Sequence, residues 1–96
     1  MDFKTVIKRI ESYMNKFDGD YSDWYVGITN DIDEQLFEIH KVDEKGVWIS
    51  FGADTEEVAK KVQKYFLEKK TDGKMIDEQI DHRIVYAYKK NSKTTP

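Results

Sequence analysis

Histidines and acidic residues are the side chains of this chain that most often bind metals or move protons. The two histidines, His40 and His82, have no paired spacing, so they do not form the short motif that a zinc site needs. Asp31, Asp33 and Glu34 lie close together but are not spaced as a calcium-binding loop. The chain also has no glycine-rich phosphate loop and no metalloprotease or serine-hydrolase motif. The sequence therefore predicts no metal site.

A glycine lies within an otherwise β-forming stretch, residues 24–29. The alternation of this stretch predicts a strand that carries Tyr25 and Gly27 on one face. A glycine inside a strand often marks the close approach of another backbone or a ligand. The alternative is that Gly27 only makes room for the N-terminal helix.

The residues after this strand predict a helix from Asn30 or Asp31 to about residue 41, because Asp31 and Glu34 resemble a capping box. The expected apolar stripe of this helix consists of Ile32, Leu36 and Ile39. Gln35 lies at the edge of that stripe, and His40 follows near the end of the helix.

The remaining periodicity predicts the elements that position these residues. Apolar side chains recur every three to four positions over residues 2–17 and 55–70, which predicts two more helices, capped by Asp2 and Asp54. Alternating runs at 47–51 and 83–89 predict two more strands. We expect an α+β fold with a small three-stranded, mainly antiparallel sheet and three helices, in the order helix, strand, helix, strand, helix, strand. The pattern does not distinguish two layers from three.

Length and composition predict a single α+β domain over residues 1–90, followed by a flexible polar tail at 91–96. Residues 18–20 predict a turn, and residues 75–82 are compatible with a short helical turn or a packed loop. The net charge of −3 disfavours nucleic acid as a partner, because an acidic surface repels phosphates. The chain has no cysteine and no apolar run of membrane-spanning length, so we expect a soluble, cytoplasmic protein.

Residues 24–68 resemble part of the GIY-YIG nuclease domain. The resemblance rests on Tyr25-Val26-Gly27, the following Thr29-Asn30, and a later helix that begins with Thr55-Glu56-Glu57. It implies that Tyr25 shapes a nuclease site. It also implies that the family's arginine is replaced by Gln35 and its metal-binding glutamate by Gln63.

Two parts of the family pattern are missing or displaced. No G-I-Y strand precedes Trp24, so the C-terminal strand could fill that place by permutation and supply Tyr86 or Tyr88. The family's histidine lies four residues after its arginine, which corresponds to Ile39. His40 is one position further, about 100° around an α-helix, and could point to solvent instead.

The two glutamines argue against catalysis. Cleavage of a phosphodiester needs a hard cation on oxygen ligands and positive charge on the phosphoryl oxygens. Gln63 provides only a neutral carbonyl, and Gln35 keeps a donor but loses the charge of arginine. Each loss would lower the rate by on the order of a hundredfold, as the removal of single donors does elsewhere. The resemblance therefore implies no cofactor, with Mg²⁺ required only if the chain is an active nuclease.

Three functions are compatible with these residues. The leading hypothesis is a non-catalytic GIY-YIG-like domain that binds a protein partner, which would suit a phage or mobile-element protein, including an inhibitor of a host system. The second is a divalent-metal-dependent endonuclease with an altered site. The third is a nucleic-acid-binding module with a surface of aromatic rings and lysines. The residues that this third hypothesis and other binding roles would use are Tyr25, His40, Trp48, Lys60, Lys64 and Tyr86.

Overall fold

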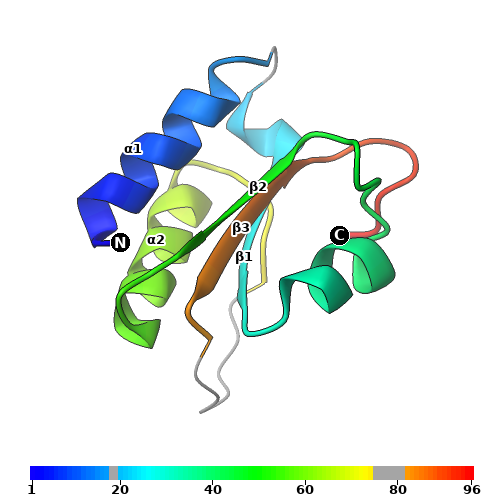
Figure 1. Ribbon diagram of the computed structural model, residues 1–96. Helices are drawn as coiled ribbons and strands as arrows, with labels where there is room; N and C mark the ends of the chain where they lie inside the picture. The colour runs from blue at the N-terminus through cyan, green and yellow to red at the C-terminus, as the bar shows by residue number, and fades with distance from the viewer. Residues whose placement is uncertain (18–19, 75–81) are drawn as a thin grey trace.

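The three strands form one antiparallel sheet with the last strand, β3, in the middle. The computed structural model describes residues 1–17, 20–74 and 82–96. Residues 18–19 of the turn expected at 18–20, and residues 75–81 of the segment 75–82, therefore lie outside the described residues. The elements are α1 (Phe3–Met14), the 3₁₀ turn η1 (Tyr21–Asp23), β1 (Trp24–Thr29), the π-helix η2 (Glu34–Ile39), β2 (Trp48–Gly52), α2 (Glu56–Glu68) and β3 (Ile84–Lys89). The predicted α+β fold and order of elements are confirmed (Figure 1).

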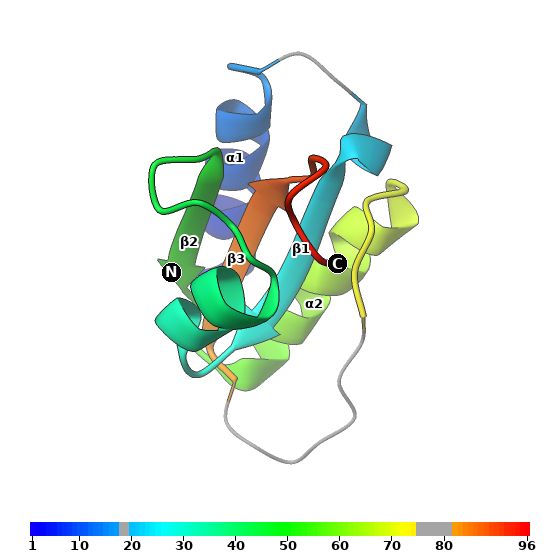
Figure 2. The same cartoon turned by 90° about the vertical axis from the view of Figure 1, so that its right-hand side faces the viewer.

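The sheet lies between two layers. α1 and α2 cover one face, which we call the helix face, while η2 and the C-terminal residues lie over the opposite face (Figure 2). The core on the helix face is built from apolar side chains of both helices and all three strands, with Val6, Val26, Val62, Phe66 and Val85 fully buried. The architecture is therefore three-layered, a question that the sequence pattern left open.

The helices begin close to where their sequences predict. The Asp2 side chain accepts a hydrogen bond from the Thr5 N–H at 2.8 Å, as expected of an N-cap. The expected cap of α2, Asp54, is wrong, because the Thr55 hydroxyl accepts the hydrogen bond of Val58 N–H at 3.1 Å. The Asp54 carboxylate instead pairs with the N-terminal ammonium of Met1 at 2.7 Å.

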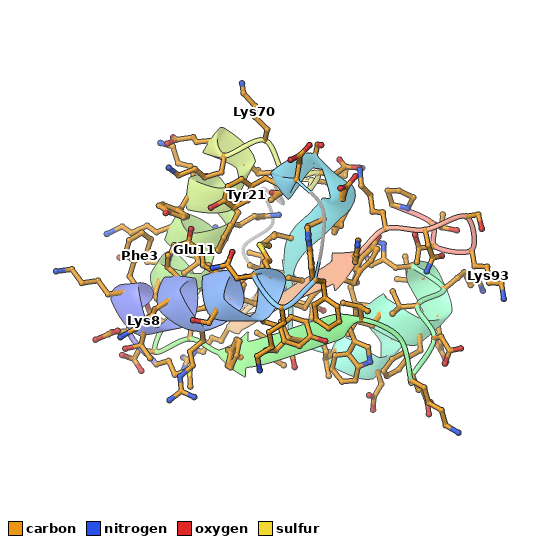
Figure 3. The ribbon with its side chains drawn as sticks, turned by 90° about the horizontal axis from the view of Figure 1, so that it is seen from above. Phe3, Lys8, Glu11, Tyr21, Lys70 and Lys93 are labelled. Atoms are coloured by element: carbon orange, nitrogen blue, oxygen red, sulfur yellow. The ribbon has the colours of Figure 1, made fainter. Side chains whose placement is uncertain are left out.

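α1 is also tied to the 3₁₀ turn that precedes β1. The Tyr21 hydroxyl donates to the Glu11 carboxylate at 2.8 Å, and the two side chains lie at neighbouring positions above α1 (Figure 3). This hydrogen bond raises the pKa of Tyr21 to about 12. None of the described helices combines the length and apolar character that a bilayer-spanning helix needs.

Candidate functional site

The sheet face opposite α1 and α2 carries a cluster of aromatic side chains, and we call it the tyrosine face. Tyr25 of β1 lies opposite Tyr88 of β3, and Gly27 lies opposite Tyr86. The ring of Tyr25 is stacked on those of Tyr88 and Tyr86, with centroid distances of 5.2 and 6.2 Å. All three rings are buried. The cluster forms because residues that face each other on adjacent antiparallel strands point to the same side of the sheet.

Gly27 leaves the space that the Tyr86 ring occupies. A Cβ atom at Gly27 would overlap the end of that ring and lie 2.9 Å from its Cε1 atom. A group does approach Gly27 closely, but it is the Tyr86 side chain of β3 and not the backbone or ligand that was expected. The alternative, room for the N-terminal helix, is wrong because α1 packs against the opposite face of the sheet.

A π-helix places His40 beside Gln35. The His40 N–H donates to the Gln35 carbonyl at 3.0 Å, five residues back, so η2 has one more residue in its turn than an α-helix. The Gln35 Nε2 and His40 Nε2 atoms are consequently 3.4 Å apart. His40, which lies one position beyond the family's histidine in sequence, is therefore next to Gln35 in the structure.

The expected apolar stripe of residues 31–41 is correct for Leu36, which is buried, and for Ile32, which packs against the same cluster, and it is wrong for Ile39. Ile39 is 47% exposed, whereas His40, for which a position facing solvent was one possibility, is only 3% exposed. Asp31 nevertheless caps this segment as predicted, since its side chain accepts from the Glu34 N–H at 3.2 Å. The sequence correctly predicted where the helix starts. The helix itself is a π-helix and not the α-helix that was expected.

The hydrogen bonds of His40 identify its tautomer. Its Nδ1 lies 2.7 Å from the Thr95 carbonyl oxygen, which can only accept, so Nδ1 carries a proton. Its Nε2 then accepts from the Tyr86 hydroxyl at 2.8 Å, and the Tyr88 hydroxyl lies 3.1 Å from Nδ1. Burial lowers the pKa of His40, and the Thr95 carbonyl partly opposes this effect. The imidazole is therefore neutral near pH 7.

The phenols of the cluster are held in their protonated form. Burial raises the pKa values of Tyr86 and Tyr88 well above that of a free phenol. Burial and the negative charge of Asp72 raise the pKa of Tyr25 in the same direction. Near neutral pH the cluster is thus a network of uncharged hydrogen-bonding groups, without a phenolate that could act as a base.

Gln63 lies at the edge of the sheet, on the helix-face side. Residues 71–74 run beside β1, where the Asp72 N–H donates to the Trp24 carbonyl at 2.8 Å and the Val26 N–H donates to the Asp72 carbonyl at 3.0 Å. The fully buried Gln63 amide donates to the carbonyls of Val26 at 3.2 Å and Lys74 at 3.1 Å. Gln63 therefore fastens residues 71–74 to the edge of β1.

The two glutamines lie on opposite sides of the sheet, Gln35 beside the tyrosine face and Gln63 on the helix-face side. A backbone hydrogen bond joins Lys74 to the Tyr25 side chain, and Gln63 binds the carbonyl of the same Lys74. Gln35 reaches the cluster from η2 through His40. Gly73 of the segment 71–74 packs closely against α2, since an added Cβ there would be 2.7 Å from a methyl group of Leu67. The structure thus joins the two glutamines through Tyr25 and Lys74 without placing Gln63 on the tyrosine face.

The other expected binding residues do not gather around this cluster. Trp48 packs edge-on against Phe37 at 5.4 Å, and its indole N–H donates to the Glu44 carbonyl at 3.0 Å. Lys60 pairs with Glu56 at 3.3 Å, and Lys64 is exposed on α2. Because α2 covers the helix face, these lysines are separated from the tyrosines by the sheet. The proposed surface of stacking rings and lysines does not form, since Tyr25 and Tyr86 are buried.

A cleft of about 550 Å³ opens beside the cluster. It is lined by Tyr25, Gln35, Ile39, His40, Asp72, Gly73, Lys74 and Pro96. The residues that sequence analysis did not find are those from segments 71–74 and 91–96, which approach the cluster only in the folded chain. Thr95 donates its N–H to the His40 carbonyl at 2.7 Å, a contact that the expected flexible tail gives no reason to predict. In the described part of the chain, no three histidine or acidic side chains are grouped to hold a metal ion.

Comparisons with known proteins give no relative. No protein-family model matches the chain, and neither the curated proteins nor the solved structures contain a match.

Proposed function

We propose that this chain is a non-catalytic, GIY-YIG-like domain that acts by binding a protein partner. The observation that carries the proposal is the buried Gln63 amide, which donates to two backbone carbonyls and is covered by residues 71–74. At the position where the resemblance expects a metal-binding carboxylate, this chain has a structural amide. Such a residue cannot provide the charged oxygen ligand that a magnesium ion requires.

Two features of the tyrosine face support the resemblance itself. β3 lies antiparallel beside β1 with Tyr86 against Gly27, which is compatible with a C-terminal strand in the place of the missing first motif. The π-helix brings His40 to Gln35 despite the extra residue between them. Both features are compatible with a remnant of that pocket on the tyrosine face, formed by Tyr86, His40 and Gln35, in which Gln63 takes no part.

Charge and exposure favour a protein over a nucleic acid as the partner. The chain has a net charge of −3, and two of the three rings that would stack on bases, Tyr25 and Tyr86, are buried. Ile39, by contrast, is the most exposed of the large apolar side chains in the described residues and lines the cleft next to the cluster. An exposed apolar residue at the rim of a cleft is typical of a contact with another protein.

The proposal is tested by combining a nuclease assay with a binding assay. Purified chain should not nick plasmid or branched DNA with Mg²⁺ or Mn²⁺, and gel shifts should show no salt-sensitive complex. Chemical crosslinking in the native host should capture a protein with the unmodified chain, and Ile39→Asp should abolish capture of that protein. Tyr21→Ser, which changes an exposed side chain elsewhere, is the control and should retain capture. Metal-dependent cleavage, or capture unaffected by Ile39→Asp, would contradict the proposal.

A further inference from the structure

The two edges of the sheet are treated differently by the rest of the chain. The edge of β1 is covered by residues 71–74, which hydrogen bond to Trp24 and Val26. β2 forms the other edge and lies at the margin of the molecule (Figures 1 and 2). An uncovered edge strand presents unpaired backbone groups to which another strand can add.

The hydrogen bonds between β2 and β3 show which backbone groups are unpaired. The Lys89 N–H donates to the Val47 carbonyl at 3.0 Å, and the Ala53 N–H donates to the Arg83 carbonyl at 2.7 Å. Odd-numbered residues of β2 therefore bond to β3, and the backbone groups of Trp48, Ser50 and Gly52 point outward. Met1 bonds to the Gly52 carbonyl at 3.1 Å and accepts from the Asp54 N–H at 2.8 Å. Within the described residues, no backbone group of the chain pairs with the outward groups of Trp48 and Ser50.

The composition of β2 is that of a covered strand. Residues 46–53 contain no charged side chain and no proline, although 36% of the chain is charged. Uncovered edges are usually protected by a lysine, a proline or a bulge, and β2 has none of the first two. Val47, Ile49 and Phe51 are only half-buried on the helix face. A second strand beside β2 would cover their exposed atoms.

We propose that two copies of this chain pair through their β2 edges. The unpaired backbone N–H and C=O groups of Trp48 and Ser50 can bond to the same groups of a second copy. An antiparallel arrangement puts Trp48 of one copy opposite Ser50 of the other. This register places Ile49 on the two-fold axis, forms four main-chain hydrogen bonds and leaves Met1 in its place beside Gly52. Two acidic chains can approach here because no like charges meet along the uncharged edge. The covered β1 edges close the assembly as a dimer with one six-stranded sheet.

A disulfide crosslink tests both the partner and the register. The chain has no cysteine, so a single introduced cysteine can react only with its symmetry mate. In the proposed register the two Ile49 residues form a non-hydrogen-bonded pair, whose Cα separation of about 4.5 Å suits a disulfide. We expect Ile49→Cys to form a covalent dimer under mild oxidation. Ser50→Cys is the matched control, because its partner position is Trp48, and it should crosslink at least about tenfold more slowly. Equal rates would overturn the proposed register.

Sedimentation at increasing concentration tests the dimer without a crosslink. Ser50→Pro removes an N–H that points away from β3, so the ladder between β2 and β3 keeps its bonds while the new pairing is blocked. We expect this variant to weaken the dimer by at least about tenfold, with Ser50→Ala as a control that still dimerises. If Ser50→Pro unfolds the chain, the comparison of crosslinking rates between Ile49→Cys and Ser50→Cys tests the dimer instead. The proposal would be overturned if the chain is monomeric at every concentration, even if the monomer binds an extended peptide at β2. It would also be overturned if the folded Ser50→Pro variant still forms the dimer.

Discussion

The helix face of the sheet is packed with apolar side chains, both aliphatic and aromatic, whereas the tyrosine face is held by hydrogen bonds among aromatic side chains. Val6, Val26, Val62 and Val85 fill the helix face without using a polar atom. On the tyrosine face, His40 bonds to Tyr86 and to Thr95, which lie 46 and 55 residues away in sequence. Burial of apolar area tolerates small shifts, but hydrogen bonds require particular atoms at particular distances. We therefore expect large stability losses from the helix face and specific, pH-sensitive losses from the tyrosine face.

The largest expected effect comes from emptying the core of the helix face. Phe66 is fully buried, so Phe66→Ala should lower the free energy of unfolding by about 3–5 kcal/mol through lost burial and the cavity that remains. Urea denaturation measures this loss. The environment of His40, followed by its NMR signals, should change little if the variant stays folded. A loss below about 1 kcal/mol would show that the helix face is not the main source of stability.

A buried charge at the edge between the two faces should cost nearly as much. Gln63→Glu places a carboxylate against the carbonyls of Val26 and Lys74, and should lower the free energy of unfolding by about 3 kcal/mol at pH 7. Burial would raise the pKa of the new carboxyl group, so the loss should shrink as the pH falls toward 4. Lys64→Glu, on the exposed side of the same helix, should cost less than about 0.5 kcal/mol. Equal losses at pH 4 and pH 7 would contradict a buried charge at position 63.

An added methyl group distinguishes a filled position of the sheet from an open one. Gly27→Ala should lower the free energy of unfolding by about 2 kcal/mol, because the new Cβ overlaps the Tyr86 ring that His40 holds in place. Gly52→Ala is the matched control, since a Cβ there meets no atom within 4 Å. The control should be neutral or slightly stabilising. Thermal unfolding of both variants provides the comparison, and similar losses would mean that Tyr86 moves aside freely.

Removal of a single hydroxyl tests the hydrogen bonds of the tyrosine face. Tyr86→Phe leaves the buried Nε2 of His40 without its donor at 2.8 Å, so the free energy of unfolding should fall by about 1.5 kcal/mol. Tyr65→Phe removes a hydroxyl whose contacts with Glu11 are 3.4 Å long, and should cost less than about 0.5 kcal/mol. Denaturant titrations of the two variants can be compared directly. A smaller loss for Tyr86→Phe than for Tyr65→Phe would exclude a structural role for the His40 network.

The smallest expected effect is the dependence of stability on the protonation of His40. Burial lowers its pKa in the folded state, so the unfolded chain binds a proton first as the pH falls. The free energy of unfolding should therefore decrease from about pH 6.5 down to the folded pKa, with a slope of at most about 1.4 kcal/mol per pH unit. His40→Gln should remove this contribution. An NMR titration that gives His40 an ordinary or raised pKa would contradict the predicted fall in the free energy of unfolding at lower pH.

The sequence by itself determined the elements of this protein and the helix-face core. Alternation and the spacing of apolar residues correctly predicted three strands and three helices, because local periodicity reflects which side chains one element buries. These features depend on residues that are neighbours in the chain, so a single sequence contains the information.

Only the tertiary structure decided what surrounds the tyrosine face. The π-helix of η2 replaces the expected α-helix, and a heptad or α-helical count cannot reveal one extra residue in a turn. The burial of His40 depends on Tyr86 and Thr95, and the position of Gln63 depends on residues 71–74. Long-range hydrogen bonds of this kind leave no periodic trace in the sequence, because the partner residues are fixed only when the sheet brings their strands together.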